Sequence, residues 1–133
     1  MTIDRSRWPV GPWDQEALDR LSWIDSETGL QCYIRRNGFG SWCGYVVMSS
    51  SASALKEEFE CLDVHGGVTY CASGFDDAHP GFWVGFDCAH YRDRSPLQTF
   101  DLDAIYRDVE YVKQQCSQLA SQLHTLRSQN PGI

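Results

Sequence analysis

The sequence predicts an α+β domain in which a small, mostly antiparallel sheet packs against a long C-terminal helix, with short helices beside it. Three observations lead to this fold class. Residues 30–48 contain two runs of β-branched and aromatic side chains around a glycine-rich turn, residues 82–88 form another apolar run, and residues 102–126 carry apolar side chains three and four apart. With 133 residues and 42% hydrophobic content, residues 1–133 are expected to fold as a single domain.

The N-terminal residues 1–13 predict an irregular arm, because Pro9 and Pro12 each fix φ and lack an N–H donor. The two tryptophans of this arm are expected to lie across the body of the domain. Asp14 is positioned to cap a short helix that runs to about Leu21.

Residues 30–36 and 42–48 predict two strands. The stretch Asn37-Gly38-Phe39-Gly40 lies between them, and Asn and Gly tolerate the positive φ that tight turns require. We therefore expect a β-hairpin here.

The middle of the chain predicts one short helix and two further strands. Apolar residues recur every three or four positions across 54–62, which is typical of a helix. Residues 68–72 and 82–88 are rich in strand-forming side chains, and the turn residues at 73–81 predict a loop between them.

Residues 102–127 predict a helix of about seven turns. Its apolar stripe consists of Leu102, Ile105, Val109, Val112, Cys116, Leu119, Leu123 and Leu126. Asp101 is expected to cap the start of this helix, and Pro131 to follow its end. The stripe either packs on the sheet or, at its far end from Cys116 to Leu126, pairs with a second copy of the chain to form a homodimer.

The net charge of the chain limits the kinds of molecule that it is expected to bind. A formal net charge of -7 argues against direct binding to nucleic acid and suits a protein whose partners carry basic surfaces. Residues 1–8 lack the apolar core of a signal peptide, and no run approaches the length of a membrane span. We therefore expect no membrane contact and a cytoplasmic location, where the six cysteines would be mostly reduced.

The side chains capable of chemistry concentrate between residues 64 and 93. His65 is followed by two glycines, which can expose backbone N–H groups to an anion, and a second group follows the strand at 82–88. The predicted ligand-binding residues are His65, Gly66, Gly67, Asp87 and His90. The candidate catalytic residues are His65, Asp87, Cys88 and His90.

These residues allow more than one reaction. In an extended segment side chains alternate between faces, so Cys88 and His90 would share one face and Asp87 would lie on the other. Cys88 could act as a nucleophile if a histidine stabilised its thiolate and Asp87 oriented that histidine. Alternatively, His65 and Asp87 could perform acid–base chemistry, or the segment could be an ordinary strand and turn.

No metal or cofactor is predicted. Cys88 and His90 could supply two ligands, but a zinc site needs three or four. The other candidates, His65, Cys71 and His79, share no recognised ligand spacing with them.

The acidic residues of this region, Asp76, Asp77 and Asp93, are expected to be solvated loop acids, because the spacing of a calcium-binding loop is absent. The sequence also lacks the motifs of P-loop NTPases, α/β-hydrolases and zincins.

Several stretches resemble a family of small, uncharacterised bacteriophage and prophage proteins. They are GPWD at 11–14, Trp23, TGL at 28–30, Cys32, WCGYV at 42–46, VHGGVTY at 64–70, WVGFDCAH at 83–90, YRDVEYV at 106–112 and LASQL at 119–123. Many members carry a His-Pro pair after the strand that contains Gly-Tyr-Val, whereas residues 48–52 contain no histidine here. That difference counts against an intact metal or catalytic site.

The resemblance implies a phage setting and no particular reaction. Small acidic phage proteins often block a host defence complex or sequester its nucleotide signal. The expected function is therefore a counter-defence inhibitor, such as an anti-CRISPR, that binds a host complex. The alternative is a small enzyme or nucleotide-binding protein that uses a pocket of His65, Asp87, Cys88 and His90.

Overall fold

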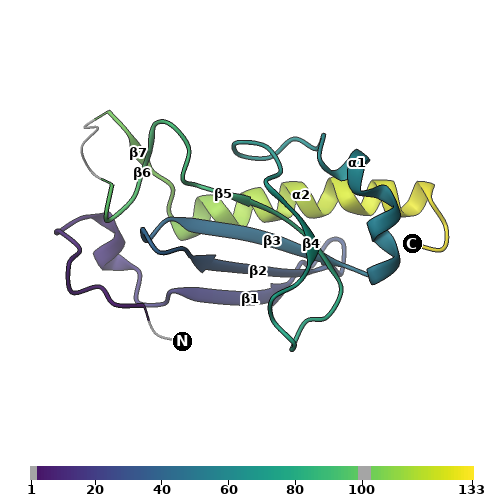
Figure 1. Ribbon diagram of the computed structural model, residues 1–133, viewed down its shortest axis with the longest axis horizontal. Helices are drawn as coiled ribbons and strands as arrows, with labels where there is room; N and C mark the ends of the chain where they lie inside the picture. The colour runs from purple at the N-terminus through teal and green to yellow at the C-terminus, as the bar shows by residue number, and fades with distance from the viewer. Residues whose placement is uncertain (1–2, 99–102) are drawn as a thin grey trace.

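A five-stranded antiparallel sheet backed by one long helix forms the centre of the computed structural model, which describes residues 3–98 and 103–133 (Figure 1). This arrangement confirms the predicted fold class. The sheet order is β1-β2-β3-β5-β4, with strands β1 (Arg20–Ile24), β2 (Gln31–Arg36), β3 (Trp42–Met48), β4 (Tyr70–Ser73) and β5 (Phe82–Asp87).

The remaining elements surround this sheet. They are the 3-10 helices η1 (Pro12–Gln15) and η2 (Ser50–Leu55), the helices α1 (Lys56–Phe59) and α2 (Val109–Gln129), and a short parallel pair, β6 (Asp93–Arg94) and β7 (Ile105–Tyr106). The helix expected over 54–62 is thus a 3-10 segment followed by a single α-helical turn.

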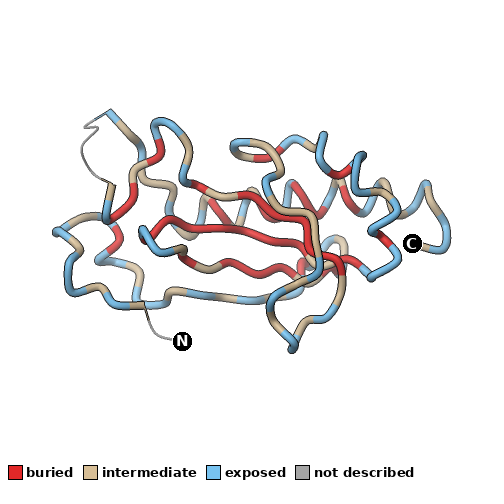
Figure 2. The backbone as a smooth tube through the Cα atoms, viewed as in Figure 1, coloured by how far each residue is buried: buried red, intermediate tan, exposed pale blue. Residues whose placement is uncertain are grey.

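One face of the sheet is covered by α2, and most of the buried residues belong to the cluster between them. Figure 2 shows buried positions along the central strands. From the helix, Val112, Cys116, Leu119 and Leu123 are fully buried against the strands. Gly44 on β3 lets the helix approach, since a Cβ there would meet the sulfur of Cys116 at 2.9 Å. Burial of this apolar surface is the main force that holds helix and sheet together.

No helix of residues 3–98 and 103–133 covers the opposite face of the sheet. Tyr33, Tyr45 and Trp83 form a second, smaller apolar cluster on this face. Phe75, from the loop between β4 and β5, packs on all three, with ring centroids 4.6 Å apart for Phe75 and Trp83. We refer to this side of the sheet as the open face.

The predicted hairpin between β2 and β3 is confirmed, although its turn differs in detail. The positive φ falls on Gly40, at 87°, rather than on Gly38. The side chain of Asn37 supports the turn by accepting hydrogen bonds from the N–H groups of Phe39 and Ser41. Asn37 therefore acts through its side-chain oxygen and not through its own backbone conformation.

The helix predicted from Asp14 to Leu21 is wrong. Only η1 forms there, and the chain then extends into β1, which pairs with β2 from Arg20 onwards. The side chain of Asp14 accepts the Gly11 N–H at 3.0 Å, within this single turn. Pairing along the edge of the sheet thus overrides the weak helical pattern of this segment.

The predicted start of the long helix is also wrong. Leu102 and the expected cap Asp101 lie outside the described residues, and Ile105 belongs to β7. The helix begins at Val109, where the carboxylate of Asp108 accepts the Tyr111 N–H at 2.9 Å. Asp108 is therefore the N-cap of α2. Ile105, which the predicted helix included, lies in the strand β7 instead.

The apolar stripe proposed for a homodimer is buried within its own domain, because Cys116, Leu119 and Leu123 have no exposed surface. A second copy would need another face of α2. Among residues 3–98 and 103–133, no helix combines the length and apolar character that crossing a membrane requires.

A buried arginine connects the N-terminal arm to the sheet. The side chain of Arg36 is 0% exposed, and its guanidinium donates to Glu16 Oε1 at 2.8 Å and to Asp19 Oδ1 at 3.0 Å. Arg5 from the arm donates to the same oxygen of Asp19. The charge of Arg36 is thus compensated by two carboxylates from the segment between η1 and β1.

Glu16 in turn holds the start of α2. Its Oε1 accepts hydrogen bonds from the Trp42 indole N–H at 3.2 Å and from the Tyr106 hydroxyl. Its Oε2 accepts the Val109 N–H, one of the unpaired donors at the helix N-terminus, at 2.7 Å. A single carboxylate therefore joins η1, β3, β7 and α2.

Replacing this carboxylate should destabilise the whole domain. For Glu16→Ala we expect the free energy of unfolding, measured by urea denaturation, to fall by about 3–5 kcal/mol, because Arg36 would keep a buried charge without its main partner. Glu27→Ala removes an exposed glutamate from a turn and serves as the control. Equal losses in the two variants would contradict the structural role of Glu16.

Candidate functional site

The predicted site residues gather where β5 ends and the chain turns towards β6. Asp87 is the last residue of β5, and its side chain lies on the open face. His90 follows in the turn, and its Nε2 lies 3.3 Å from Asp87 Oδ1. The hydroxyl of Thr69 donates to the other carboxylate oxygen of Asp87 at 2.9 Å.

Cys88 does not join this group. Its side chain points into the core beneath α2, and burial raises the pKa of its thiol far above the ordinary range. The prediction that Cys88 and His90 share one face is therefore wrong. Regular alternation of side chains stops with β5 at Asp87, so His90 follows the geometry of a turn.

The side chains of His65 and His90 lie close to each other beside Gly66 and Gly67. Gly66 and Gly67 have φ of 68° and 82°, a conformation that favours glycine. The ring of His90 packs directly on Gly66, where a Cβ would collide with it, whereas Gly67 faces open space. The two imidazole rings lie 6.1 Å apart between centroids. The glycines thus permit a close contact between the two histidine segments.

Asp93 on β6 is the centre of the site. Its side chain is 1% exposed, and its Oδ2 lies 2.8 Å from His65 Nε2 and accepts the His90 backbone N–H at 3.0 Å. Its Oδ1 accepts from Arg107 Nε at 3.0 Å. The expectation of a solvated loop acid is wrong for Asp93, because these donors replace the water that the carboxylate loses on burial.

Helix α2 supplies the remaining contacts of His65. The hydroxyl of Tyr111 lies 2.7 Å from His65 Nδ1, and Gln115 accepts the His65 backbone N–H at 2.8 Å. Burial raises the pKa of Tyr111, so its phenol stays protonated at neutral pH. When His65 is neutral, its Nε2–H donates to Asp93 while its Nδ1 accepts from Tyr111.

This geometry limits the chemistry of His65. Both of its ring nitrogens are engaged, and its side chain is only 12% exposed. A general base needs a nitrogen within hydrogen-bond reach of a substrate proton, and a metal ligand needs a free lone pair. Among the described residues, no group of three or more His, Cys, Asp or Glu side chains could hold a metal ion.

A depression of about 230 Å³ adjoins the site on its outer side. His90, Tyr91, Asp93, Gln98 and Ala104 contribute to its lining. It is smaller than most small-molecule pockets, which span about 300–1,000 Å³. The depression is therefore better suited to a side chain of a partner than to a free metabolite.

Sequence reasoning missed Tyr111 and Arg107 as site residues. They lie four apart on the chain, and the guanidinium of Arg107 lies 5.1 Å from the centroid of the Tyr111 ring. Arg107 precedes the N-cap Asp108, so its contact with Tyr111 does not come from the i, i+4 geometry of a helix. Their proximity to His65 depends on how α2 crosses the sheet, which no local pattern reveals.

Comparison with known proteins yields no relative, because no protein-family model, curated protein or solved structure matches this chain. The resemblance to a bacteriophage family stays a prediction.

The two glycines provide a matched test of the contact between the histidines. Gly66→Ala and Gly67→Ala should each lose about 1–2 kcal/mol of stability through the strained backbone. Gly66→Ala should lose about 1–3 kcal/mol more, because the new methyl group displaces the His90 ring. Urea denaturation measures both losses, and the NMR resonances of His90 report its displacement. Identical stabilities for the two variants would rule out the packing of His90 on Gly66.

Thiol alkylation tests the location of Cys88. In the native protein at pH 8, iodoacetamide should modify the exposed Cys61 and leave Cys88 unmodified, because a buried and protonated thiol does not react. Mass spectrometry of the digested protein identifies the modified residues. Modification of Cys88 as fast as Cys61 would reinstate it as a candidate nucleophile.

Proposed function

We propose that this chain is a phage-type intracellular binding protein, a counter-defence inhibitor of the anti-CRISPR kind, that acts by binding a host protein complex. The observation that carries the proposal is an exposed aromatic residue, Tyr91, on a rigidly supported turn at residues 90–93. We call these four residues the Tyr91 turn.

The Tyr91 turn is held in an unusual conformation. The Asp93 N–H closes it by donating to the His90 carbonyl at 2.9 Å. Arg92 has a φ of 73°, which side-chain-bearing residues seldom adopt. Such strain persists only where surrounding contacts impose it, and it is concentrated at functional sites. Here the contacts of Asp93 with His65 and Arg107 impose it.

The strained turn leaves Tyr91 88% exposed. Ile105 is a large exposed apolar residue beside this turn, because its N–H donates to the Arg92 carbonyl at 2.8 Å. Phe39 and Leu97 are a further exposed apolar pair, in which Leu97 N donates to the Phe39 carbonyl at 3.2 Å. An exposed tyrosine among apolar neighbours is a typical anchor of a protein–protein interface.

The charge of the chain favours a basic partner. A formal net charge of -7 attracts a positively charged surface and speeds encounter with it. Host complexes that bind nucleic acid expose such surfaces. The resemblance to bacteriophage proteins supports a target in the host defence machinery.

The alternative, a small enzyme or nucleotide-binding protein built on His65, Asp87, Cys88 and His90, has less support. Cys88 lies in the core, and His65 has both nitrogens bonded within the protein. In the proposed function these histidines and Asp93 support the Tyr91 turn instead of contacting a substrate.

Phage infection assays test the proposal. Expression of the chain in bacteria that carry a defence system should restore plaque formation, and affinity purification should recover a host complex. Tyr91→Ser should reduce the restoration at least about tenfold, because loss of an interface anchor costs 2 kcal/mol or more. Ile24→Ser removes an exposed apolar side chain at the far end of β1 and should have no effect.

Two results would refute the proposal. One is full restoration of plaques by Tyr91→Ser. The other is the lack of any restoration, and of any co-purified complex, for the unmodified chain across a panel of defended hosts.

A further inference from the structure

Two arginines lie side by side on the open face. Arg20 on β1 and Arg35 on β2 are direct cross-strand partners. Residues in this relation have Cβ atoms roughly 5 Å apart, and like charges there destabilise a sheet. Within residues 3–98 and 103–133, neither arginine takes part in an ion pair. In a chain with 18 acidic and 11 basic residues, this juxtaposition needs an explanation, and a bound anion would supply one.

Arg35 is held in place by an aromatic ring. Its guanidinium carbon lies 3.7 Å from the centroid of the Phe75 ring, a cation–π contact. Phe75 in turn packs on Tyr33, Tyr45 and Trp83. A guanidinium fixed in this way loses little conformational entropy when it binds an anion.

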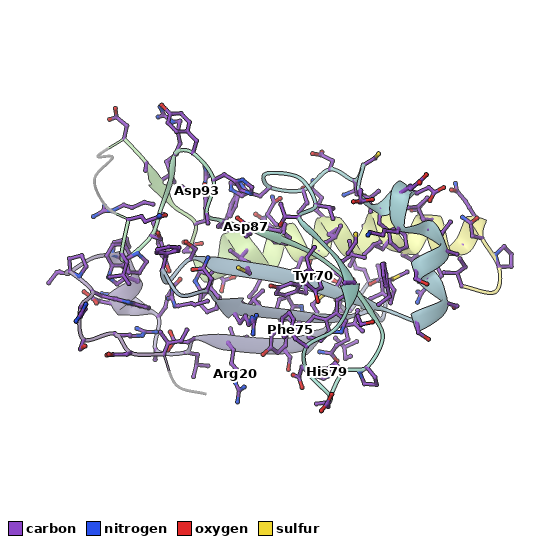
Figure 3. The ribbon with its side chains drawn as sticks, viewed as in Figure 1. Arg20, Tyr70, Phe75, His79, Asp87 and Asp93 are labelled. Carbon is purple, nitrogen blue, oxygen red and sulfur yellow. The ribbon has the colours of Figure 1, made fainter. Side chains whose placement is uncertain are left out.

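A depression of about 480 Å³ lies beside Arg20, within the range of small-molecule pockets, and Arg35 is outside its lining. Arg20, Ser22, Tyr33, Asp76 and His79 contribute to its lining, and Figure 3 shows Arg20, Phe75 and His79 on this side of the sheet. The ring of His79 lies 6.4 Å from that of Tyr33. Asp76 is the acid of this lining, and its Oδ1 accepts the Ala78 N–H at 2.9 Å within the loop.

We propose that this depression binds a mononucleotide. Arg20 contacts the phosphate, because a guanidinium group donates paired hydrogen bonds to phosphate oxygens, and the charge of Arg35 on the neighbouring strand adds to the attraction for the anion. The ring of His79 packs against the base, as aromatic side chains do in nucleotide recognition, and the buried Tyr33 contacts that ring. The acidic net charge and the size of the depression favour a single nucleotide over a nucleic-acid strand.

This site goes beyond the proposed function and uses different residues. The Tyr91 turn follows β5, whereas the arginines belong to β1 and β2 at the other side of the sheet. Each can therefore be lost without the other. Tyr91→Ser should leave nucleotide binding unchanged.

Isothermal titration calorimetry of the full chain with AMP, adenosine and inorganic phosphate tests the proposal. AMP should bind with a stoichiometry of one and more tightly than adenosine or phosphate. Arg20→Gln should weaken AMP binding about tenfold, through loss of a charge-assisted hydrogen bond, and Arg35→Gln should weaken it less, through loss of a neighbouring charge. His79→Ala should weaken AMP binding and leave phosphate binding unchanged.

Arg127→Gln is the matched control, because it removes the same charge from α2 on the other face of the sheet. Its affinity for AMP should equal that of the unmodified chain, and circular dichroism confirms that each variant is folded. Three results would overturn the proposal: no AMP binding at millimolar concentration, equal effects of Arg127→Gln and Arg20→Gln, or binding of a DNA oligonucleotide without binding of AMP.

Discussion

The rest of this structure depends on one interaction, the ion pairing of the buried Arg36 guanidinium with Glu16 and Asp19. A charge with no exposed surface is tolerated only beside compensating carboxylates, and Glu16 and Asp19 supply them. Because Glu16 also accepts hydrogen bonds from Tyr106 and Val109, compensation of Arg36 determines where β7 lies and where α2 begins. The N-terminal arm, the sheet and the long helix are thus positioned by one polar network at the edge of an apolar core.

A second polar network performs a similar task at the end of β5. Asp93 is nearly as buried as Arg36, and it is compensated by Arg107 and by the ring of His65. Asp93 supports the Tyr91 turn, in which Arg92 has a strained backbone and Tyr91 is exposed. Histidine, aspartate and tyrosine in mutual contact resemble a catalytic relay. Their enclosure is better suited to a structural role, since both ring nitrogens of His65 already have a protein partner.

The two faces of the sheet are used differently. The face beneath α2 is filled with aliphatic, aromatic and cysteine side chains and provides the stability of the domain. The open face combines aromatic rings with Arg20 and Arg35 under a single loop, an arrangement that contributes less to stability and leaves polar groups available to a ligand. Such a division is common in antiparallel sheets, in which only one side needs to be covered.

The sequence by itself determined the α+β class, the hairpin of β2 and β3, the strand β5 and the apolar stripe of α2, because each follows from a local pattern of side chains. It also indicated that His65, Asp87 and His90 belong near one another. Only the tertiary structure decided that β1 is a strand, that α2 begins at Val109 and that Asp93 is the centre of the site. The physical reason is that these features depend on partners far along the chain: Glu16 and Val109 are joined across 93 positions, and His65 and Tyr111 across 46. No periodicity within a short segment encodes such contacts.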